Sequence, residues 1–553
     1  METDFQRRVF DYVPINDRAP AQGTAHPVIV VGAGPVGLAT AIDLAQQGVA
    51  TILLDDDNCL SVGSRAICFS KRTLEIFDRL RCGERMVEKG VNWNVGKVFF
   101  RDEPLYSFDL QPERGHQRPA FINLQQYYVE GYLYERAQQL PLLDMRWQNR
   151  VTGLTQADDH VALTVATPDG EYQLRAQYVV AADGGRSALR GLLGLESKGR
   201  VFRDRFLIAD VKMKADFPTE RWFWFDPPFH PGQSVLLHRQ PDNVWRVDFQ
   251  LGWDADPEFE KQPAQVIPRI EALLGKSAEF SLEWVSVYTF CCLRMDGFRQ
   301  GRVLFAGDAA HGVSPFGARG ANSGVQDADN LAWKLRLVVE GKAPAGLLDT
   351  YASEREFAAD ENILNSTRAT DFITPKSAVS RLFRDAVLEL ARHHQFARSL
   401  VNSGRLSLPS SYNNSPLNTA DDAAFGAAMR PGAPGADAPV TVDRRPDWFL
   451  RQVGDEFTGV LFSDAAPDAG MRAAADALAR GAIPVRTLFV VPAGRADGEA
   501  DVLEDGEGLL AERFDARPGT YYLLRPDQHV CARWRRFDAG QVRRAVATAT
   551  CNH

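Results

Sequence analysis

The chain has 553 residues, of which 45% are hydrophobic and 24% are charged, and its formal net charge is −9 at pH 7. This length exceeds one ordinary core and predicts roughly two to four structural units. The composition is typical of globular proteins. The acidic balance excludes a protein that binds nucleic acid through phosphate contacts, because no basic excess is available to displace counterions.

The cysteine spacing argues against a disulfide-bonded or metal-binding protein, and the apolar stretches argue against a membrane-anchored one. The chain has seven cysteines without a C-x-x-C spacing, so we expect neither a disulfide framework nor a metal site. The first residues, METDFQRRVF, lack an apolar h-region, and the apolar stretch 27–42 is interrupted by glycines and a proline. A turn explains that stretch better than a membrane span. We therefore expect a cytoplasmic protein without a membrane anchor.

A first nucleotide-binding unit is predicted over residues 28–55. An apolar strand, 28–31, leads into a G-x-G-x-x-G turn, a helix follows, and a second strand, 51–54, ends at Asp55. The turn contains Gly32, Gly34, Pro35 and Gly37. These glycines permit a tight bend and let a pyrophosphate approach the helix N-terminus. Asp55 is placed to accept hydrogen bonds from an adenosine ribose.

A second segment with nucleotide-binding features lies near the middle of the chain. Residues 178–182 predict a strand, followed by Asp183, Gly184 and a helix start that includes Arg190. The turn supplies backbone donors. Asp183 and Arg190 are placed for polar contacts to a pyrophosphate or a passing nicotinamide dinucleotide.

The third segment is GRVLFAGDAAHGVSPFGARGANSG, from Gly301 to Gly324. A strand, 303–306, ends at Gly307-Asp308, whose carboxylate is suited to a ribityl or ribose hydroxyl. A loop rich in proline and glycine follows and enters a helix near Asn322. The positive end of that helix would stabilise the negative charge of a reduced flavin. Three such separated segments favour FAD over a simple nicotinamide dinucleotide.

In this order the segments resemble those of the FAD-dependent aromatic hydroxylases, the group A flavoprotein monooxygenases that include para-hydroxybenzoate hydroxylase and phenol hydroxylase. The resemblance covers roughly Val28 to Arg368. GSRAICFSKRTLEIF is similar to a segment in which an arginine, here Arg65, lies near the cofactor. INLQQYYVEGYLYERA is similar to a Q-x-x-x-E-x-x-L helix, with Gln125 reaching the cofactor. Without the resemblance, Arg65 reads as a surface charge and Gln125 as a solvated helix residue.

The resemblance implies a set of cofactor-binding residues: Gly32, Gly34, Pro35, Gly37, Asp55, Arg65, Gln125, Asp183, Gly307, Asp308, Pro315, Gly320, Ala321 and Asn322. One departure stands in the flavin loop. Many relatives read A-G-Q-G-M-N where this chain reads Gly-Ala-Arg-Gly-Ala-Asn at 317–322. Arg319 either adds positive charge near the flavin or faces solvent.

The expected fold class is α/β with three domains. We expect a Rossmann-like FAD-binding domain (20–90, 121–195 and 296–375), an interleaved mixed β-sheet substrate domain (91–120 and 196–295), a helical segment and linker (376–438), and a thioredoxin-like C-terminal domain (439–553). The C-terminal domain lacks C-x-x-C, so we interpret it as a redox-inert module for packing or dimerisation. His529 in that domain is interpreted as structural.

The resemblance implies that NADH or NADPH reduces FAD and that a flavin C4a-hydroperoxide hydroxylates an electron-rich phenol or catechol with O2. No second G-x-G-x-x-G is visible, as expected of transient nicotinamide binding. The candidate catalytic residues are Tyr288, His311 and Arg319. His238 and Arg246 are alternative substrate contacts, although His238 also reads as a surface residue of a strand.

Several alternatives stay open from the sequence. The substrate class includes simple phenols, hydroxylated aromatic acids and substituted catechols, among them nitrocatechols. A flavin-dependent epoxidase or a polyketide-tailoring hydroxylase would share the cofactor motifs. A non-catalytic flavin-binding scaffold is a rival from another class, although an inert site needs no loop that leaves access to the flavin. A homodimer is an expectation from the resemblance.

Overall fold

The computed structural model describes residues 5, 8–14, 25–63, 65–215, 217–401, 406, 408–496, 498–499 and 501–552. Residues 20–24, which begin the predicted FAD-binding domain, lie outside the described residues, as do residues 64, 216, 402–405 and 407. All seven cysteines are free. Within the described ranges no helix is long and apolar enough to span a membrane, and no three His, Cys, Asp or Glu side chains gather as metal ligands would.

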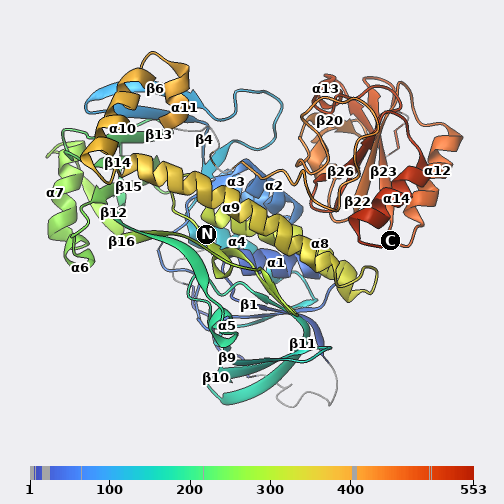
Figure 1. The fold of residues 1–553 in the computed structure, drawn as a ribbon, viewed down its shortest axis with the longest axis horizontal. Coiled ribbons are helices and arrows are strands. Elements are labelled where there is room, and N and C mark those ends of the chain that lie inside the picture. The colour runs from blue at the N-terminus through green and yellow to red at the C-terminus, as the bar shows by residue number, and fades with distance from the viewer. Residues whose placement is uncertain are drawn as a thin grey trace.

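The first sheet lies in the lower part of the molecule in Figure 1, where β1, β9, β10 and β11 are labelled. Its order is β17 (Arg299–Gln300), β18 (Val303–Phe305), β11 (Gly170–Ala181), β1 (His26–Val31), β2 (Thr51–Leu54) and β8 (Leu143–Arg146), and β10 (Val161–Thr167) joins β11 to β9 (Arg150–Gln156). The pairs β1·β2, β1·β11 and β11·β18 are parallel. The carboxyl ends of β2, β1, β11 and β18 therefore meet at one edge.

Helix α1 (Pro35–Gln46) packs on β1, β2 and β8, and α4 (Gln126–Ala137) and α8 (Gly320–Val339) lie against α1. Helices α2 (Lys71–Arg79) and α3 (Gly83–Lys89) pack on α8 and α4, and α5 (Ala188–Leu192) packs against β9. A small antiparallel sheet of β3 (Cys68–Ser70), β7 (Phe121–Asn123) and β4 (Val91–Trp93) lies between this part and the next. The predicted strand, helix and strand of the first nucleotide unit are confirmed.

The second sheet is mixed and curved, and it lies on the left of Figure 1. Its order is β19 (His311–Gly312), β16 (Phe280–Met295), β12 (Ser197–Met213), β15 (Val244–Leu251), β14 (Ser234–Arg239), β13 (Arg221–Phe225), β5 (Val95–Phe100) and β6 (Glu103–Asp109). One face packs against α6 (Pro257–Glu260) and α7 (Pro263–Leu274). The helices α10 (Ala378–Ala391) and α11 (Gln395–Val401) lie beside β6.

Side chains of this sheet alternate between its two faces. Trp222 and Trp224 of β13 pack with the core under α7, whereas Phe223 and Phe225 pack on the opposite face with Phe316. The aromatic residues predicted from the sequence are thus divided between a structural core and the face that carries the candidate substrate site.

The C-terminal domain is separate and lies on the right of Figure 1. Its sheet has the order β21 (Arg445–Trp448), β20 (Pro439–Val442), β24 (Val502–Asp505), β23 (Val485–Pro492), β22 (Phe457–Phe462), β25 (Tyr521–Leu524) and β26 (Val530–Trp534), and its helices are α12 (Ala469–Ala479), α13 (Leu509–Arg513) and α14 (Ala539–Ala549). β22 is parallel to β23 and antiparallel to β25. This order confirms the thioredoxin-like expectation.

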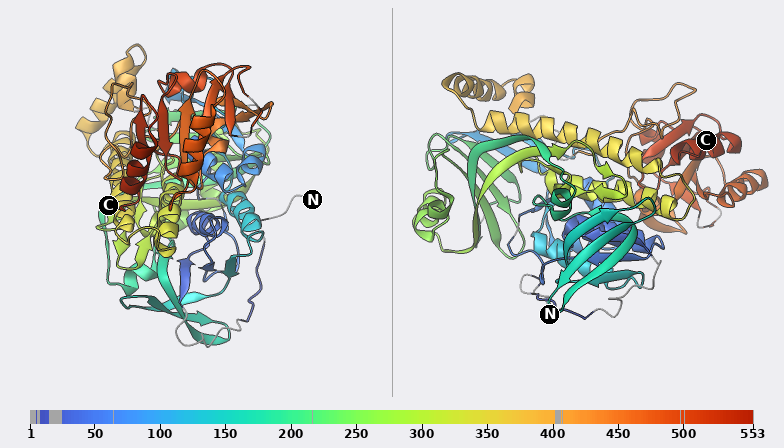
Figure 2. Two further views of the ribbon diagram at one scale, coloured as in Figure 1. Left: turned by 90° about the vertical axis from the view of Figure 1, so that its right-hand side faces the viewer. Right: turned by 60° about the horizontal axis from the view of Figure 1, so that its bottom comes forward.

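One long helix, α9 (Leu347–Ile373), connects the parts. Its 27 residues correspond to about 40 Å of helix. Figure 1 and Figure 2 show it running from the second sheet to the C-terminal domain. Ile373 at one end packs with Phe225 and Phe316, and Leu347 at the other end packs with Phe457 of β22. The helix thus contacts both the candidate substrate face and the C-terminal core.

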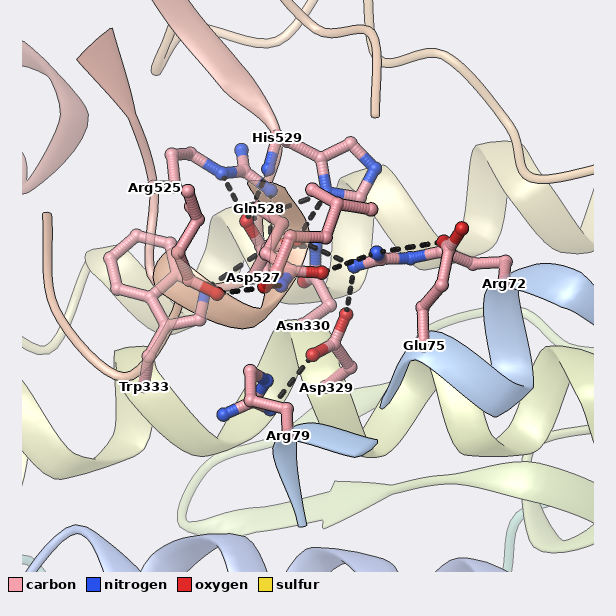
Figure 3. Close-up of polar contacts among 12 residues, drawn as sticks. Arg72, Glu75, Arg79, Asp329, Asn330, Trp333, Arg525, Asp527, Gln528 and His529 are labelled. Atoms are coloured by element: carbon pink, nitrogen blue, oxygen red, sulfur yellow. Dashed lines mark hydrogen bonds and ion pairs between the residues drawn. The ribbon is translucent and has the colours of Figure 1, made fainter. Parts of the chain in front are cut away.

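A buried polar network fastens the C-terminal domain to the rest of the protein (Figure 3). Arg72 of α2 pairs with Asp329 of α8 at 3.0 Å and donates to the backbone carbonyl of Asp527 at 2.8 Å. Arg525 pairs with Asp527 at 2.5 Å and with Glu354 of α9 at 2.6 Å. Because buried charges are costly unless they are paired, this network fixes how the C-terminal turn 525–529 sits on α2, α8 and α9.

Candidate active site

The turn after β1 has the geometry of a phosphate site. Gly32 has φ +102°, and a Cβ there would lie 2.4 Å from the carbonyl oxygen of Ala182. A Cβ at Gly37 would lie 1.7 Å from the carbonyl oxygen of Gly32. At Gly34, by contrast, a Cβ would meet no atom within 4 Å. Packing therefore requires Gly32 and Gly37, whereas Gly34 faces open space at the N-terminus of α1, where an anion is stabilised.

Asp55 follows the carboxyl end of β2, beside this turn. Its carboxylate accepts hydrogen bonds from the backbone N–H groups of Ala33 and Asp57, the latter at 2.8 Å. Burial raises the pKa of Asp55 to about 6, against the effect of these two bonds. At neutral pH the group is therefore ionised and can accept further hydrogen bonds, as from ribose hydroxyls.

Asp183 follows β11 at the same edge of the sheet. One carboxylate oxygen accepts from the N–H of Leu189 at 3.1 Å, and the other is buried without a hydrogen-bond partner among the described residues. Burial raises the pKa of this group. A buried polar atom without a partner is unusual in a native protein and points to a missing ligand or water.

Arg190 was expected to contact a pyrophosphate or a nicotinamide dinucleotide, but its guanidinium is bound to two backbone carbonyls. Its guanidinium donates to the carbonyl of Gly185 at 2.6 Å and to the carbonyl of Ala309 at 2.8 Å. The side chain therefore connects the loop after β11 with the loop after β18, instead of extending toward a cofactor. The two loops are held at a fixed separation at the sheet edge.

The Gly307-Asp308 turn is held from below by an acid that sequence analysis missed. Gly307, with φ +61°, donates its N–H to Asp327 of α8 at 2.8 Å. Asp327 also contacts His311 Nε2 at 2.7 Å and Arg355 of α9 at 2.5 Å. Burial acts to raise the pKa of Asp327, but the charges of His311 and Arg355 outweigh it and lower the pKa. The only sequence signal was an acid within the apolar stripe of the helix.

A cavity of about 380 Å³ lies where the second sheet meets the loop after this turn. Its walls come from β5, β6, β13, the loop 316–319, α9 and α11. Its lining includes Phe223, Phe225, Phe316, Arg221, Arg319 and Arg368. An apolar aromatic pocket with a few polar groups is the usual form of a small-molecule site.

Comparison with known proteins decides the family. Residues 25–366 match the family described as "FAD binding domain". The chain belongs to the FAD-dependent aromatic hydroxylases. Residues 445–549 match the "HcaD C-terminal domain", so both the catalytic part and the C-terminal domain have family counterparts.

Two relatives and one solved structure place the hydroxylase more closely. It is 33% identical over 539 residues to a 6-methylpretetramide 4-monooxygenase of Streptomyces rimosus, covering 94% of this chain and 92% of the relative. It is 33% identical over 333 residues to a probable NADH-specific resorcinol 4-hydroxylase of Rhodococcus jostii, covering 60% and 62%. The solved complex of aklavinone-11 hydroxylase with FAD and aklavinone has a TM-score of 0.77 at 25% identity, covering 96% of this chain and 100% of that one.

The residues at the sheet edge fit FAD, which the family binds. The open space at Gly34 suits a pyrophosphate, and the buried unpartnered oxygen of Asp183 suits a ligand hydroxyl. Asp308 is exposed beside the turn. These features follow parallel strands at one edge, where nucleotides bind in such sheets.

The hydroxylase differs from the sequence-based expectation at the flavin loop. Helix α8 begins at Gly320, with Arg319 at its N-cap, and not near Asn322. Asn322 is buried and accepts from the N–H of Ser70 at 2.8 Å, so it fixes the start of α8 against β3. Gly320 and Ala321 are half-buried, whereas Pro315 is exposed.

The alternative that Arg319 faces solvent is wrong. Its side chain is buried, donates to Asn362 of α9 at 2.8 Å and lines the cavity. Arg65, in contrast, is exposed, and its backbone carbonyl accepts from Arg246 at 3.2 Å. The sequence could not show whether Arg319 is buried or exposed, because the burial of its side chain depends on packing against α9, which is distant in the sequence.

Gln125 is not solvated, and its Oε1 is buried without a hydrogen-bond partner among the described residues. The side chain is buried and donates to the carbonyl of Pro241 at 3.2 Å. Its neighbour Gln126 accepts from the N–H of Ala66 at 3.1 Å and donates to Glu130 at 2.8 Å. With Glu130 and Leu133 it is Gln126 that satisfies the Q-x-x-x-E-x-x-L spacing, so counting along the motif would have found it.

The candidate catalytic residues have different surroundings. His311 is buried beneath the Gly307-Asp308 turn, paired with Asp327, and does not line the cavity. His238 is buried, which corrects its reading as a surface residue. Tyr288 is half-buried on the face of β16 that carries Phe290, where burial raises its pKa. His311 is thus placed to support the turn, and Tyr288 stays on the candidate substrate face.

Proposed function

We propose that the protein hydroxylates a phenolic or catecholic ring with NADH or NADPH and O2. The observation that carries this proposal is that the aromatic cavity and the flavin loop share residues: Phe316, Gly317 and Arg319 belong to both. A substrate seated on Phe223 and Phe225 is thereby adjacent to the loop that follows the Gly307-Asp308 turn. The reaction needs an electron-rich aromatic ring as substrate, and the aromatic side chains of the cavity wall can pack against such a ring.

The chain's own residues have distinct parts in this proposal. FAD, when bound, supplies the redox chemistry that takes hydride from NAD(P)H and oxygen from O2. The N-terminus of α1 at Gly34 holds its pyrophosphate, and Asp55 and Asp308 accept its hydroxyl groups. Arg319 holds positive charge at the loop. Tyr288 is not among the described residues that line the cavity, and its proposed part is to contact a phenolic oxygen of a substrate that extends from the cavity along the face of β16.

A polycyclic polyketide substrate is the second candidate. The relative that matches this chain almost end to end is a 6-methylpretetramide 4-monooxygenase, with 92% of its length covered. The resorcinol hydroxylase matches a shorter part, 62% of its length. A 3-(3-hydroxy-phenyl)propionate/3-hydroxycinnamic acid hydroxylase of Klebsiella pneumoniae matches over a similar length, 93% of each chain, at 28% identity. The support for the polycyclic class is therefore the higher identity of the polyketide relative, 33%.

The test is oxygen uptake by the FAD-loaded protein with NADH or NADPH against phenols, catechols and polycyclic phenols, with peroxide and product mass followed together. Hydroxylation predicts one aromatic that accelerates uptake and gains one oxygen atom without equivalent peroxide. An epoxide product would favour the epoxidase alternative. Absence of flavin reduction by both nicotinamides would favour the non-catalytic scaffold.

A further inference from the structure

The size of the cavity limits the substrate. A cavity of about 150 Å³ accommodates benzene, and this one measures about 380 Å³. The difference leaves room for two or three rings. Its apolar wall comes from Phe223 and Phe225 of β13, Phe316 of the flavin loop and Ile373 of α9, which are flat or branched surfaces suited to fused aromatic rings.

The polar part of the lining is cationic. Arg221, Arg319, Arg368 and Lys97 line the cavity, and no Asp or Glu belongs to the described residues that line it. Lys97 is balanced by Glu220 at 2.9 Å. Arg368 lies at the exposed rim. Positive charge therefore exceeds negative charge at the cavity wall.

Arg221 is the decisive member of this group. It is the first residue of β13, on the same face as Phe223 and Phe225, and its relative exposure is only 9%. No hydrogen bond or ion pair joins its guanidinium to another residue in the described part of the chain. Arg246, which is also buried on this sheet, is bound by Asp210 through two nitrogens at 2.8 Å. Arg221 has no such carboxylate.

The surroundings of Arg221 compensate its charge only in part, through the buried carboxylate of Asp248, with which it forms no ion pair in the described part of the chain. Burial lowers the pKa of Arg221, against a weaker attraction from Cys68 and Asp248. A guanidinium nonetheless stays protonated in proteins. A buried charge without a partner is costly, so a ligand that brings the missing anion into the cavity would be stabilised there.

We propose that this cavity takes a bicyclic or tricyclic aromatic substrate that carries a carboxylate, and that Arg221 is the specificity-determining residue that binds this carboxylate. The inference rests on the proposed function, because it assigns the substrate class of the same site. A carboxylate is ionised throughout the neutral range, whereas an ordinary phenol is not. Its planar pair of oxygens matches the two-pronged guanidinium.

The test is fluorescence titration of the FAD-loaded protein with anthracene-2-carboxylate, its uncharged carboxamide and benzoate. The wild type is expected to bind the carboxylate at least tenfold more tightly than the carboxamide, and benzoate more weakly than both. Arg221→Met is expected to lose this preference and keep its affinity for the carboxamide, which shows that the fold is intact. Arg221→Lys is expected to restore part of the preference.

A matched control removes the same charge elsewhere. Arg444 is exposed in the β20–β21 turn of the C-terminal domain, and Arg444→Met is expected to bind all three probes as the wild type does. Equal affinity of the wild type for carboxylate and carboxamide would overturn the proposal, as would an equal loss of both in Arg221→Met.

Turnover separates this proposal from the proposed function. Carboxylate binding without hydroxylation of any aromatic would leave the anion site standing and refute the hydroxylase. Hydroxylation of neutral phenols with no preference for polycyclic acids would support the hydroxylase and refute the anion site.

Discussion

Gly34 and Gly37 lie three residues apart in the phosphate turn, and alanine at each is expected to fail in a different way. At Gly34 the backbone has φ −71° and ψ −179°, which alanine adopts without strain, and the added methyl group enters open space. At Gly37 the methyl group would lie 1.7 Å from a backbone oxygen. Gly34→Ala should therefore weaken FAD binding, and Gly37→Ala should weaken the fold.

The magnitudes follow from these environments. At Gly34 the lower entropy of the unfolded chain and the poorer N-cap oppose one another, so the stability of the apoprotein should change by less than about 1 kcal/mol. Loss of one charge-assisted hydrogen bond to a phosphate costs about 1.5–3 kcal/mol, which corresponds to roughly 10- to 150-fold weaker FAD binding. Gly37→Ala should cost about 3 kcal/mol or more, which lowers Tm by roughly 6–12 °C.

The assay uses apoprotein of each variant, with Tm from circular dichroism and FAD affinity from flavin fluorescence. Gly34→Ala should keep the wild-type Tm without FAD and lose most of the stabilisation that FAD adds. The reasoning fails if Gly34→Ala binds FAD as the wild type does while its apoprotein melts as early as that of Gly37→Ala. The turn would then be purely structural.

Three further outcomes are expected. FAD affinity of the apoprotein should fall as pH drops through about 6, the value to which burial raises the pKa of Asp55, because protonation removes a ribose acceptor. In a fluorescence titration Asp55→Asn should bind FAD more weakly than the wild type above about pH 6 and should lose this pH dependence, and a retained pH slope would contradict the assignment. Asp527→Asn should cost about 3 kcal/mol, because it removes one of the two carboxylates that pair with buried Arg525. Exposed Asp296→Asn should leave Tm unchanged, and equal melting of the two variants would refute the network. Arg319→Gln removes a positive charge and should make the two-electron flavin potential more negative by about 30 mV, or 1.4 kcal/mol. Flavin reduction measured by stopped flow should be slower. An unchanged potential would count against a charge near the flavin.

The acid sensitivity of the network has a definite sign. In the folded state burial acts to raise the pKa of Asp527, but Arg525 and His529 outweigh it and lower the pKa well below the ordinary range. An acid with a lowered folded pKa contributes stability that is present above its unfolded pKa. That contribution is lost as pH falls below about 4, so acid should weaken the attachment of the C-terminal domain.

The sequence predicted those structural features that are determined by residues close together along the chain. The βαβ unit, the strands that precede Asp183 and Gly307, and the division into two sheets and a C-terminal domain follow from local periodicity and turn chemistry, and the structure confirms these elements. The motif spacing identifies Gln126, but the sequence could not show which of Gln125 and Gln126 is buried. Adjacent residues at a helix start point about 100° apart, and which one is buried is decided by Pro241, 116 residues along the chain from Gln125.

The same limit explains why the role of the C-terminal domain was invisible in the sequence. Arg72 contacts the carbonyl of Asp527 across 455 positions of the chain, and no periodicity encodes such a pair. Yet Glu354, which binds Arg525, precedes Arg355, which binds Asp327 under the Gly307-Asp308 turn. Adjacent residues of α9 thus serve the C-terminal network and the turn at the FAD edge. The C-terminal domain is therefore part of the scaffold on which the flavin loop is built.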